Sequence, residues 1–221
     1  MKKTLTLAAL LLGTTVMATA AQAEKTAESG FVTKQAGQFL VRARVIDVDP
    51  QTSTSSVSVI GGKVNVTDQI APEVDLSYFI TNNIAVEAIA ASTRHVASVT
   101  GSKLSAGKVN VGSVWVLPPT VTVQYHFMTQ SRFSPYLGAG ISVDWFYNST
   151  PMSGLNRISF TNAVGPALQA GFDYALDGHW SLNADIKQIF INTTASVNSG
   201  FVKAKTALNP TVFGVGVGYR F

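Results

Sequence analysis

Residues 211–221 read T-V-F-G-V-G-V-G-Y-R-F, a pattern that decides the fold class of the chain. Phe213, Val215, Val217, Tyr219 and Phe221 share one parity, while the alternate positions carry a valine, three glycines and an arginine. A period of two is that of a β-strand, so this strand has one large apolar face and one face that is small or charged. A soluble protein would bury the large face against a second sheet, whereas an outer-membrane barrel would turn it toward lipid.

The sequence stops at Phe221, directly after this strand. In a closed barrel the last strand pairs with the first, so closure predicts a strand at the end of the chain. An aromatic last residue also resembles the terminal signature of outer-membrane barrels in general. That resemblance implies two partners, the outer-membrane lipid around the barrel and the barrel assembly machinery, which would recognise Phe221.

The first 23 residues have the pattern of a secretory signal peptide. Lys2 and Lys3 form a charged start, residues 5–16 are mostly apolar, and residues 21–23 read A-Q-A, an A-x-A cleavage site. The apolar run is too short for a transmembrane anchor. We therefore expect a signal peptide at 1–23, a loose periplasmic arm at 24–37 and a barrel at 38–221.

The composition is apolar, but the apolar residues do not form a candidate transmembrane helix. Hydrophobic residues make up 46% of the chain and charged residues 13%, about half of the ~25% that is usual in soluble domains. No segment after residue 23 has the 18 consecutive apolar residues of a spanning helix, which leaves a closed barrel in the bacterial outer membrane. Half of the formal net charge of +4 comes from Lys2 and Lys3, and no basic cluster predicts a nucleic-acid partner. The chain has no cysteine, so no disulfide holds the fold.

Eight alternating segments predict an all-β fold, an eight-stranded antiparallel transmembrane β-barrel. The connections between them alternate between long and short, which is typical of four long outer loops and three short periplasmic turns. Several segments exceed the ~9–11 residues needed to span a membrane, so we expect the wall to project beyond the outer leaflet. The expected strands are residues 38–46, 69–79, 84–93, 120–127, 134–146, 161–175, 180–193 and 211–221.

Aromatic residues lie near both ends of these strands, as in the two girdles of a membrane barrel. The competing fold is a soluble eight-stranded ligand barrel, which is apolar inside and polar outside. Alternation alone does not separate the two folds, but the low charge content, the girdles and the export signal favour the membrane barrel. The expected girdles are Phe39, Tyr78, Phe127, Tyr174, Trp180 and Phe221 at the short-turn end, and Trp145, Phe190 and Phe213 toward the long loops.

Several short motifs carry a family resemblance. Residues 117–125 read L-P-P-T-V-T-V-Q-Y, residues 135–141 P-Y-L-G-A-G-I, residues 82–87 N-N-I-A-V-E and residues 180–183 W-S-L-N. With the terminal G-Y-R-F, these motifs resemble the outer-membrane protein W (OmpW) family, which includes the AlkL-type proteins. The resemblance implies a barrel that passes small hydrophobic molecules across the outer membrane by an apolar channel opening sideways into the bilayer.

The inward-facing positions change character along the barrel. An eight-stranded interior holds only side chains or one small ligand. At the short-turn end we expect a lumen plug of paired charges: Arg42, Arg44, Glu73, Asp75, Glu87, Asp173, Asp185 and Lys187. Toward the outer side we expect an apolar passage formed by Ile46, Ala91, Leu117, Pro118, Pro119, Phe146, Ile189 and Ile191, although these residues would also suit the packing of loop bases.

Two departures from the family concern its lateral opening. In many members the third strand ends A-A-T-P-F-x-H, with a proline that interrupts pairing to the fourth strand; here residues 90–95 read A-A-S-T-R-H. Lys187 stands where the family often carries an inward tryptophan. Pro118 and Pro119 cannot donate ladder hydrogen bonds, so we expect them to keep the seam between the third and fourth strands unzipped on the outer side.

Signals of catalysis are weak. His95, His126 and His179 lie on different segments, and their spacing does not converge on a metal site. A lipid-modifying barrel enzyme would need a His and Ser pair facing lipid, whereas parity turns His126 toward the lumen. We expect no enzyme, no cofactor and no metal. The second hypothesis is a structural or adhesive barrel whose outer loops bind a partner, and a continuous apolar passage would discriminate against it.

Overall fold

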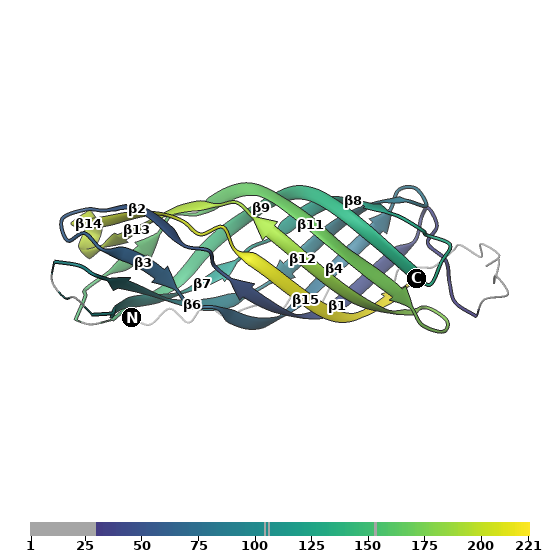
Figure 1. Ribbon diagram of the computed structural model, residues 1–221, viewed down its shortest axis with the longest axis horizontal. Coiled ribbons are helices and arrows are strands. Elements are labelled where there is room, and N and C mark those ends of the chain that lie inside the picture. The colour runs from purple at the N-terminus through teal and green to yellow at the C-terminus, as the bar shows by residue number, and fades with distance from the viewer. Residues whose placement is uncertain (1–29, 104, 106, 153) are drawn as a thin grey trace, which may run out of the picture.

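The computed structural model describes residues 30–221 except 104, 106 and 153, and these form one elongated barrel (Figure 1). The predicted signal peptide and the first part of the predicted arm lie outside the described residues. Within the described part of the chain, no helix is long and apolar enough to cross a membrane.

Eight strands close into an antiparallel ring, which confirms the predicted fold. β15 pairs back to β1 from Arg220 opposite Leu40 to Thr211 opposite Asp49, so the ring has no free edge. β4 has the predicted bounds, whereas β9 runs five residues past the predicted Phe146 to Pro151. The ring consists of β1 (Phe39–Asp49), β4 (Gln69–Phe79), β5 (Ile84–Ala91), β8 (Thr120–His126), β9 (Phe133–Pro151), β11 (Ala163–Ala175), β12 (Trp180–Ile189) and β15 (Thr211–Arg220).

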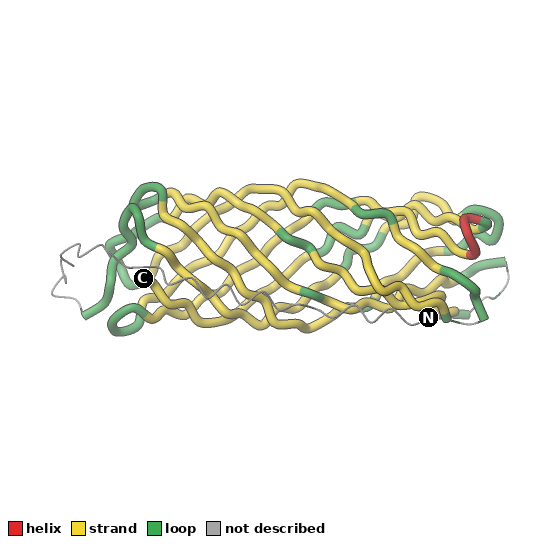
Figure 2. Tube along the Cα trace, turned by 180° about the vertical axis from the view of Figure 1, so that it is seen from behind, coloured by secondary structure: helices red, strands yellow, loops and turns green. Residues whose placement is uncertain are grey.

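The long outer connections carry further strands that the sequence did not predict. They gather at the end of the barrel away from the C-terminus, as Figures 1 and 2 show from opposite sides. β7, β6 and β3 continue outward from β9, while β10, β13, β14 and β2 form a separate four-stranded sheet. The bounds are β2 (Ser53–Val57), β3 (Lys63–Val66), β6 (Thr93–Thr100), β7 (Val109–Leu117), β10 (Ile158–Phe160), β13 (Asn192–Val197), the short 3-10 helix η1 (Asn198–Gly200) and β14 (Val202–Ala207). The wall therefore extends well past the ring.

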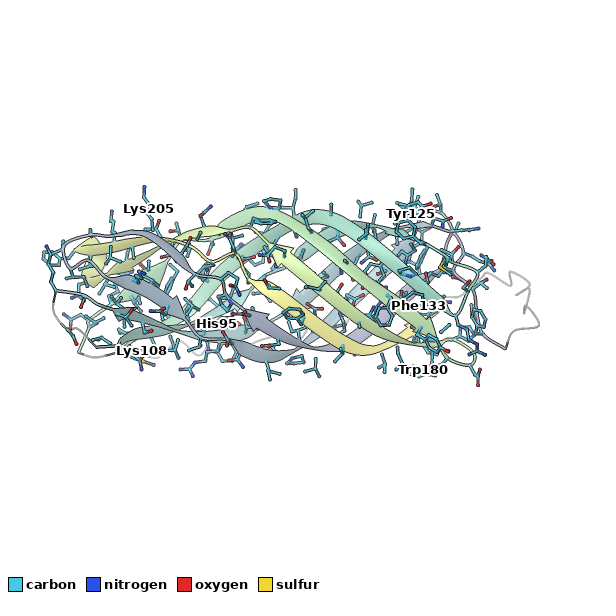
Figure 3. The ribbon with its side chains drawn as sticks, in the orientation of Figure 1. His95, Lys108, Tyr125, Phe133, Trp180 and Lys205 are labelled. Atoms are coloured by element: carbon cyan, nitrogen blue, oxygen red, sulfur yellow. The ribbon has the colours of Figure 1, made fainter. Side chains whose placement is uncertain are left out.

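The outside of the ring is apolar, with the predicted parity. Leu137, Ile141 and Val215 are each more than half exposed, although they lie in the middle of paired strands. All nine predicted girdle residues are exposed as well. Figure 3 places Tyr125 and Trp180 at the end of the barrel opposite Lys108 and Lys205. A continuous apolar band between aromatic girdles is the surface that lipid covers in an outer-membrane barrel.

Candidate functional site

The N-terminal segment closes the short-turn end of the barrel. Phe31 bridges to Gly178, and Lys34, although a lysine, is only 2% exposed. The Nζ atom of Lys34 donates to Asp173 at 2.8 Å and to Ser134 at 2.7 Å. The prediction of a loose arm is wrong for residues 30–37, because Lys34 ties this segment to the buried carboxylate of β11. The polar, unpatterned sequence of the segment held no signal for this contact.

Arg42 is the centre of the buried charges in the adjoining half of the lumen. Its guanidinium donates to both carboxylate oxygens of Asp173, at 3.1 Å from Nε and 3.1 Å from Nη2. Its Nη1 atom lies 2.9 Å from Asp75 and 3.3 Å from Glu87. This is the paired-fork geometry in which arginine binds carboxylates most strongly. Arg42 thus joins carboxylates that belong to three strands, β4, β5 and β11.

Arg44 and Lys187 extend these contacts toward the middle of the barrel. Arg44 lies 2.8 Å from Glu73 and 2.8 Å from Asp75. Lys187, from β12, lies 3.1 Å from Glu73 and 3.0 Å from Asp185. The structure therefore brings all eight residues of the expected plug into one buried group. Parity had turned His126 toward the lumen, and it is one of the neutral members of this group. Sequence reasoning missed the other neutral members, which include Thr122, Gln124, Tyr136, Gln169 and Asn183.

Charge is balanced within this group, which we call the ion network. The eight plug residues and Lys34 contribute four cations and five carboxylates joined by ion pairs. Arg220, which is buried beside Lys34 and Asp173 and donates to the Val32 carbonyl, adds the fifth cation. Burying a charge costs several kcal/mol unless it is paired and hydrogen-bonded, so a balanced set is the arrangement that this low-dielectric interior tolerates. The ion network fills the lumen at this height and leaves the barrel axis blocked by charged side chains.

Above the ion network lies an apolar cavity of ≈ 80 Å³. Glu73 and Lys187 of the ion network line it, while apolar side chains form most of its wall. Six of the eight expected passage residues line it: Ile46, Ala91, Pro118, Phe146, Ile189 and Ile191. Leu117 and Pro119 are not in the lining, and their expected place there is wrong because they have the opposite parity to Pro118 along an extended chain. Sequence reasoning missed lining residues from the outer strands, including Val64, His95, Val114 and Thr206.

The wall of this cavity contains a break in pairing at the two prolines. β5 and β8 pair as far as Ile89 opposite Thr120, and β6 and β7 begin again at Thr93 opposite Val116. The register is the same on both sides, so residues 90–92 face 117–119 without laddering. The expectation of a seam unzipped on the outer side is met only at residues 90–92 and 117–119, because β6 and β7 restore the pairing directly above the break.

The two prolines remove donors toward different neighbours. In an antiparallel strand the N–H and C=O of one residue point to one neighbour, and those of the next residue to the other. The N–H of His126 donates to Asn83, in the turn before β5, and the N–H of Phe127 donates to Pro135 of β9. The backbone groups of even-numbered residues along β8 therefore point toward β5. By the same alternation Pro118 lacks its N–H on the β5 side, whereas Pro119 lacks it on the β9 side.

Ala91 is the residue opposite Pro118 at the break. The N–H of Ile80 donates to the carbonyl of Ile84, so even-numbered residues of β5 direct their backbone groups toward β4. Odd-numbered residues, including Ala91, therefore direct theirs toward β8 and Pro118. The carbonyl of Pro118 instead accepts from the Thr120 hydroxyl at 3.1 Å. Ala91 and Pro118 both line the cavity, so the break lies in its side wall.

Comparison with known proteins places these features in a family. The OmpW family model matches residues 35–221. An uncharacterized outer-membrane protein, y4mB, from Sinorhizobium fredii is 41% identical over 184 residues, covering 82% of this chain and 79% of that protein. The crystal structure of the outer membrane protein OprG from Pseudomonas aeruginosa superposes with a TM-score of 0.79 at 28% identity, covering 86% of this chain and 98% of that one. A more distant relative is the dibenzothiophene metabolism operon protein PahQ of Pseudomonas aeruginosa, 25% identical over 177 residues, covering 79% of this chain and 82% of that protein.

Proposed function

The chain belongs to the OmpW family of bacterial outer-membrane barrels, and we propose that it carries small hydrophobic molecules through its apolar cavity into the membrane. The observation that supports this most is the contrast within one lumen, a cavity lined by isoleucine, valine and alanine above a blocked, charged floor. Removing apolar surface from water is favourable by roughly 25 cal/mol per Å², so such a cavity attracts apolar solutes. The name of PahQ associates that relative with dibenzothiophene metabolism, and dibenzothiophene is a compact apolar molecule.

A sideways route suits the passenger better than the barrel axis. Below the cavity the ion network would have to separate its charge pairs, which costs several kcal/mol for each charge left unpaired. Through the wall, the passenger would move from an apolar cavity to an apolar bilayer with little change in solvation. The break between residues 90–92 and 117–119 is the part of that wall where backbone hydrogen bonds do not have to be broken.

The cavity has to widen before it can hold a molecule as large as benzene. An apolar cavity of about 150 Å³ binds benzene, and the cavity here is ≈ 80 Å³. We therefore expect transport to require displacement of side chains and of the wall at the break, so variants that tighten the break slow the passage of the molecule.

The experiment compares the two prolines of the break, Pro118, whose missing N–H is on the β5 side, and Pro119, whose missing N–H is on the β9 side. Bacteria that oxidise toluene and lack other OmpW-family proteins would express the wild type, Pro118→Val or Pro119→Val, and the initial uptake of radiolabelled toluene would be measured. Pro118→Val supplies a backbone N–H that can donate to Ala91, so this variant is expected to remove at least half of the uptake that the wild type adds. Pro119→Val restores a donor toward β9 only and is expected to keep most of it.

Heat-dependent mobility on a gel would show that each variant is folded, because a closed barrel resists detergent until heated. Equal uptake by folded Pro118→Val and wild type would remove the break as the exit. If the wild type itself added no uptake over cells without the protein, the transport function would fail and the hypothesis of a structural or adhesive barrel would be favoured.

A further inference from the structure

Asp144 differs from the other buried carboxylates of the lumen. It lies on β9 with 2% of its surface exposed, and it lines the apolar cavity rather than the ion network. Ser142 donates to its Oδ1 atom at 2.6 Å. Glu73, Asp75, Glu87, Asp173 and Asp185 each have a cation within ion-pair distance. Among the described residues, no ion pair joins Asp144 to a cation, and Ser142 supplies the one hydrogen bond to its carboxylate. The Oδ2 atom is not one of the fully buried side-chain atoms that lack a partner, so it keeps a surface on which a group in the cavity could bind.

A buried carboxylate of this kind is costly to retain. An acceptor removed from water without a partner costs about 1–3 kcal/mol, and more when it is charged. A leucine or valine at this position would complete the apolar wall at no such cost. A donor group arriving in the cavity would bond this carboxylate, so the position favours a ligand that carries a donor.

Polar contacts connect Asp144 to the break. The Oγ1 atom of Thr120 lies 3.1 Å from the Pro118 carbonyl oxygen and 3.1 Å from the Oγ atom of Ser142, which in turn donates to Asp144. These four residues form a polar line across a side wall that is mostly apolar. The free acceptor is thus in the part of the cavity that adjoins the proposed exit.

We propose that Asp144 accepts a hydrogen bond from the single polar group of an otherwise apolar passenger, so that the cavity prefers hydrophobic amines and alcohols to hydrocarbons and excludes carboxylates. This inference rests on the proposed function, since it names the class of molecule that the cavity takes. An ammonium or hydroxyl group supplies the missing donor, whereas a carboxylate supplies a second acceptor and a repelling charge. A site built to bond a polar group discriminates strongly against the analogue that lacks it, because its own buried group is then unpaired.

Four ligands of one shape test the preference: benzylamine, benzyl alcohol, toluene and benzoate. Each would be titrated into the folded protein in nanodiscs of zwitterionic lipid, and dissociation constants would be read from the methyl NMR signals of Ile189 and Ile191. For the wild type we expect benzylamine to bind at least tenfold more tightly than toluene, benzyl alcohol to lie between them, and benzoate not to bind.

Three variants separate charge, acceptor and position. Asp144→Leu should bring benzylamine, benzyl alcohol and toluene within about twofold of one another. Asp144→Asn keeps an acceptor oxygen but no charge. It should still bind benzyl alcohol more tightly than toluene, and it should lose most of the additional affinity of the wild type for benzylamine. Asp68→Leu removes an exposed carboxylate outside the cavity lining and should leave the wild-type order unchanged.

The outcomes distinguish this inference from the function on which it rests. If the wild type binds toluene as tightly as benzylamine, or if Asp144→Leu keeps the preference, Asp144 is not the recognition element while the hydrophobic cavity still stands. If none of the four ligands shifts the signals of Ile189 and Ile191 in the wild type, both the inference and the proposed function are overturned.

Discussion

The two halves of the lumen are enclosed by the same ring of strands, yet one half is filled and the other is hollow. In the half with the short turns, long cationic side chains such as Arg42 and Lys187 reach across the interior and pair with carboxylates of other strands. In the outer half the inward positions carry shorter apolar groups such as Ile46, Ala91 and Val212, which leave a cavity. Strand number sets the width of a barrel. The comparison shows that the length and charge of inward side chains then decide whether that width is blocked or usable.

The backbone also differs between the two halves, since it is closed at the filled end and divided at the hollow end. At the filled end the segment with Lys34 covers the opening, and short turns join the strands. At the hollow end the wall divides between the strands that continue from β9 and a separate four-stranded sheet. The break at Pro118 lies where these outer strands begin. A charged floor and a divided, apolar wall are the features on which the proposed lateral passage rests.

The largest expected effect comes from removing the central cation of the filled half. Arg42→Met leaves Asp75, Glu87 and Asp173 with too little positive charge and should destabilise the barrel by about 3–5 kcal/mol. Urea unfolding in lipid vesicles, followed by tryptophan fluorescence, would measure it. Lys108→Met, at an exposed site on the outer end, should change stability by less than about 0.5 kcal/mol. Equal effects of the two substitutions would mean that the ion network does not hold the filled half together.

A smaller effect is expected in the hollow half, at His95 on β6. This side chain is 5% exposed, with Nδ1 2.7 Å from the Thr67 carbonyl oxygen and Nε2 2.9 Å from the Thr93 hydroxyl. Burial lowers the pKa of His95 from its ordinary value of 6.5, and the Thr67 carbonyl and Asp68 only partly oppose this. The unfolded outer wall then binds more protons than the folded wall, so stability is complete above the ordinary pKa and falls as the pH drops below 6.5.

Amide hydrogen exchange would measure this loss of local stability. Between pH 7.5 and 5.5 the exchange of β6 amides, corrected for intrinsic rates, should speed up by at most about tenfold, since pH 5.5 is one unit below the ordinary pKa. Amides of β12 in the ring should not follow. His95→Gln should abolish the pH effect on β6, and its persistence in that variant would assign it to another group.

The sequence predicted the ring well because the information it needs is local. A period of two in residues 69–79 or 211–221 identifies both the strand and its lipid-facing side. The outer strands escaped prediction because their alternation is interrupted. The pairing of β6 with β7 changes register between Ala97 and Ser98, and the pairing of β7 with β9 shifts between Ser113 and Trp115. An extra residue in a strand reverses the parity of all that follow.

The candidate site was predictable only as far as parity reaches. Parity placed Ile189 and Arg42 on the inner face, and the change from charged to apolar residues along that face was visible in the sequence. Contacts between distant segments were not visible, such as the ion pair of Lys34 with Asp173. Nor was it visible that Asp144, among the described residues, would have no cation beside it. Such facts depend on which side chains meet across the lumen, and alternation carries no information about that.

One measurement tests the central claim most directly, namely that the hollow half is the binding site for apolar molecules. The chain carries isoleucines on both faces, with Ile46, Ile189 and Ile191 in the cavity lining and Ile141 and Ile186 exposed on the lipid side. With isoleucine methyl groups labelled and the protein in nanodiscs of deuterated lipid, intermolecular nuclear Overhauser effects from toluene would be recorded. We predict contacts from toluene to Ile46, Ile189 and Ile191 that saturate with concentration. Contacts to Ile141 and Ile186 alone, rising without saturation, would contradict the account, because toluene would then occupy the lipid and not the cavity.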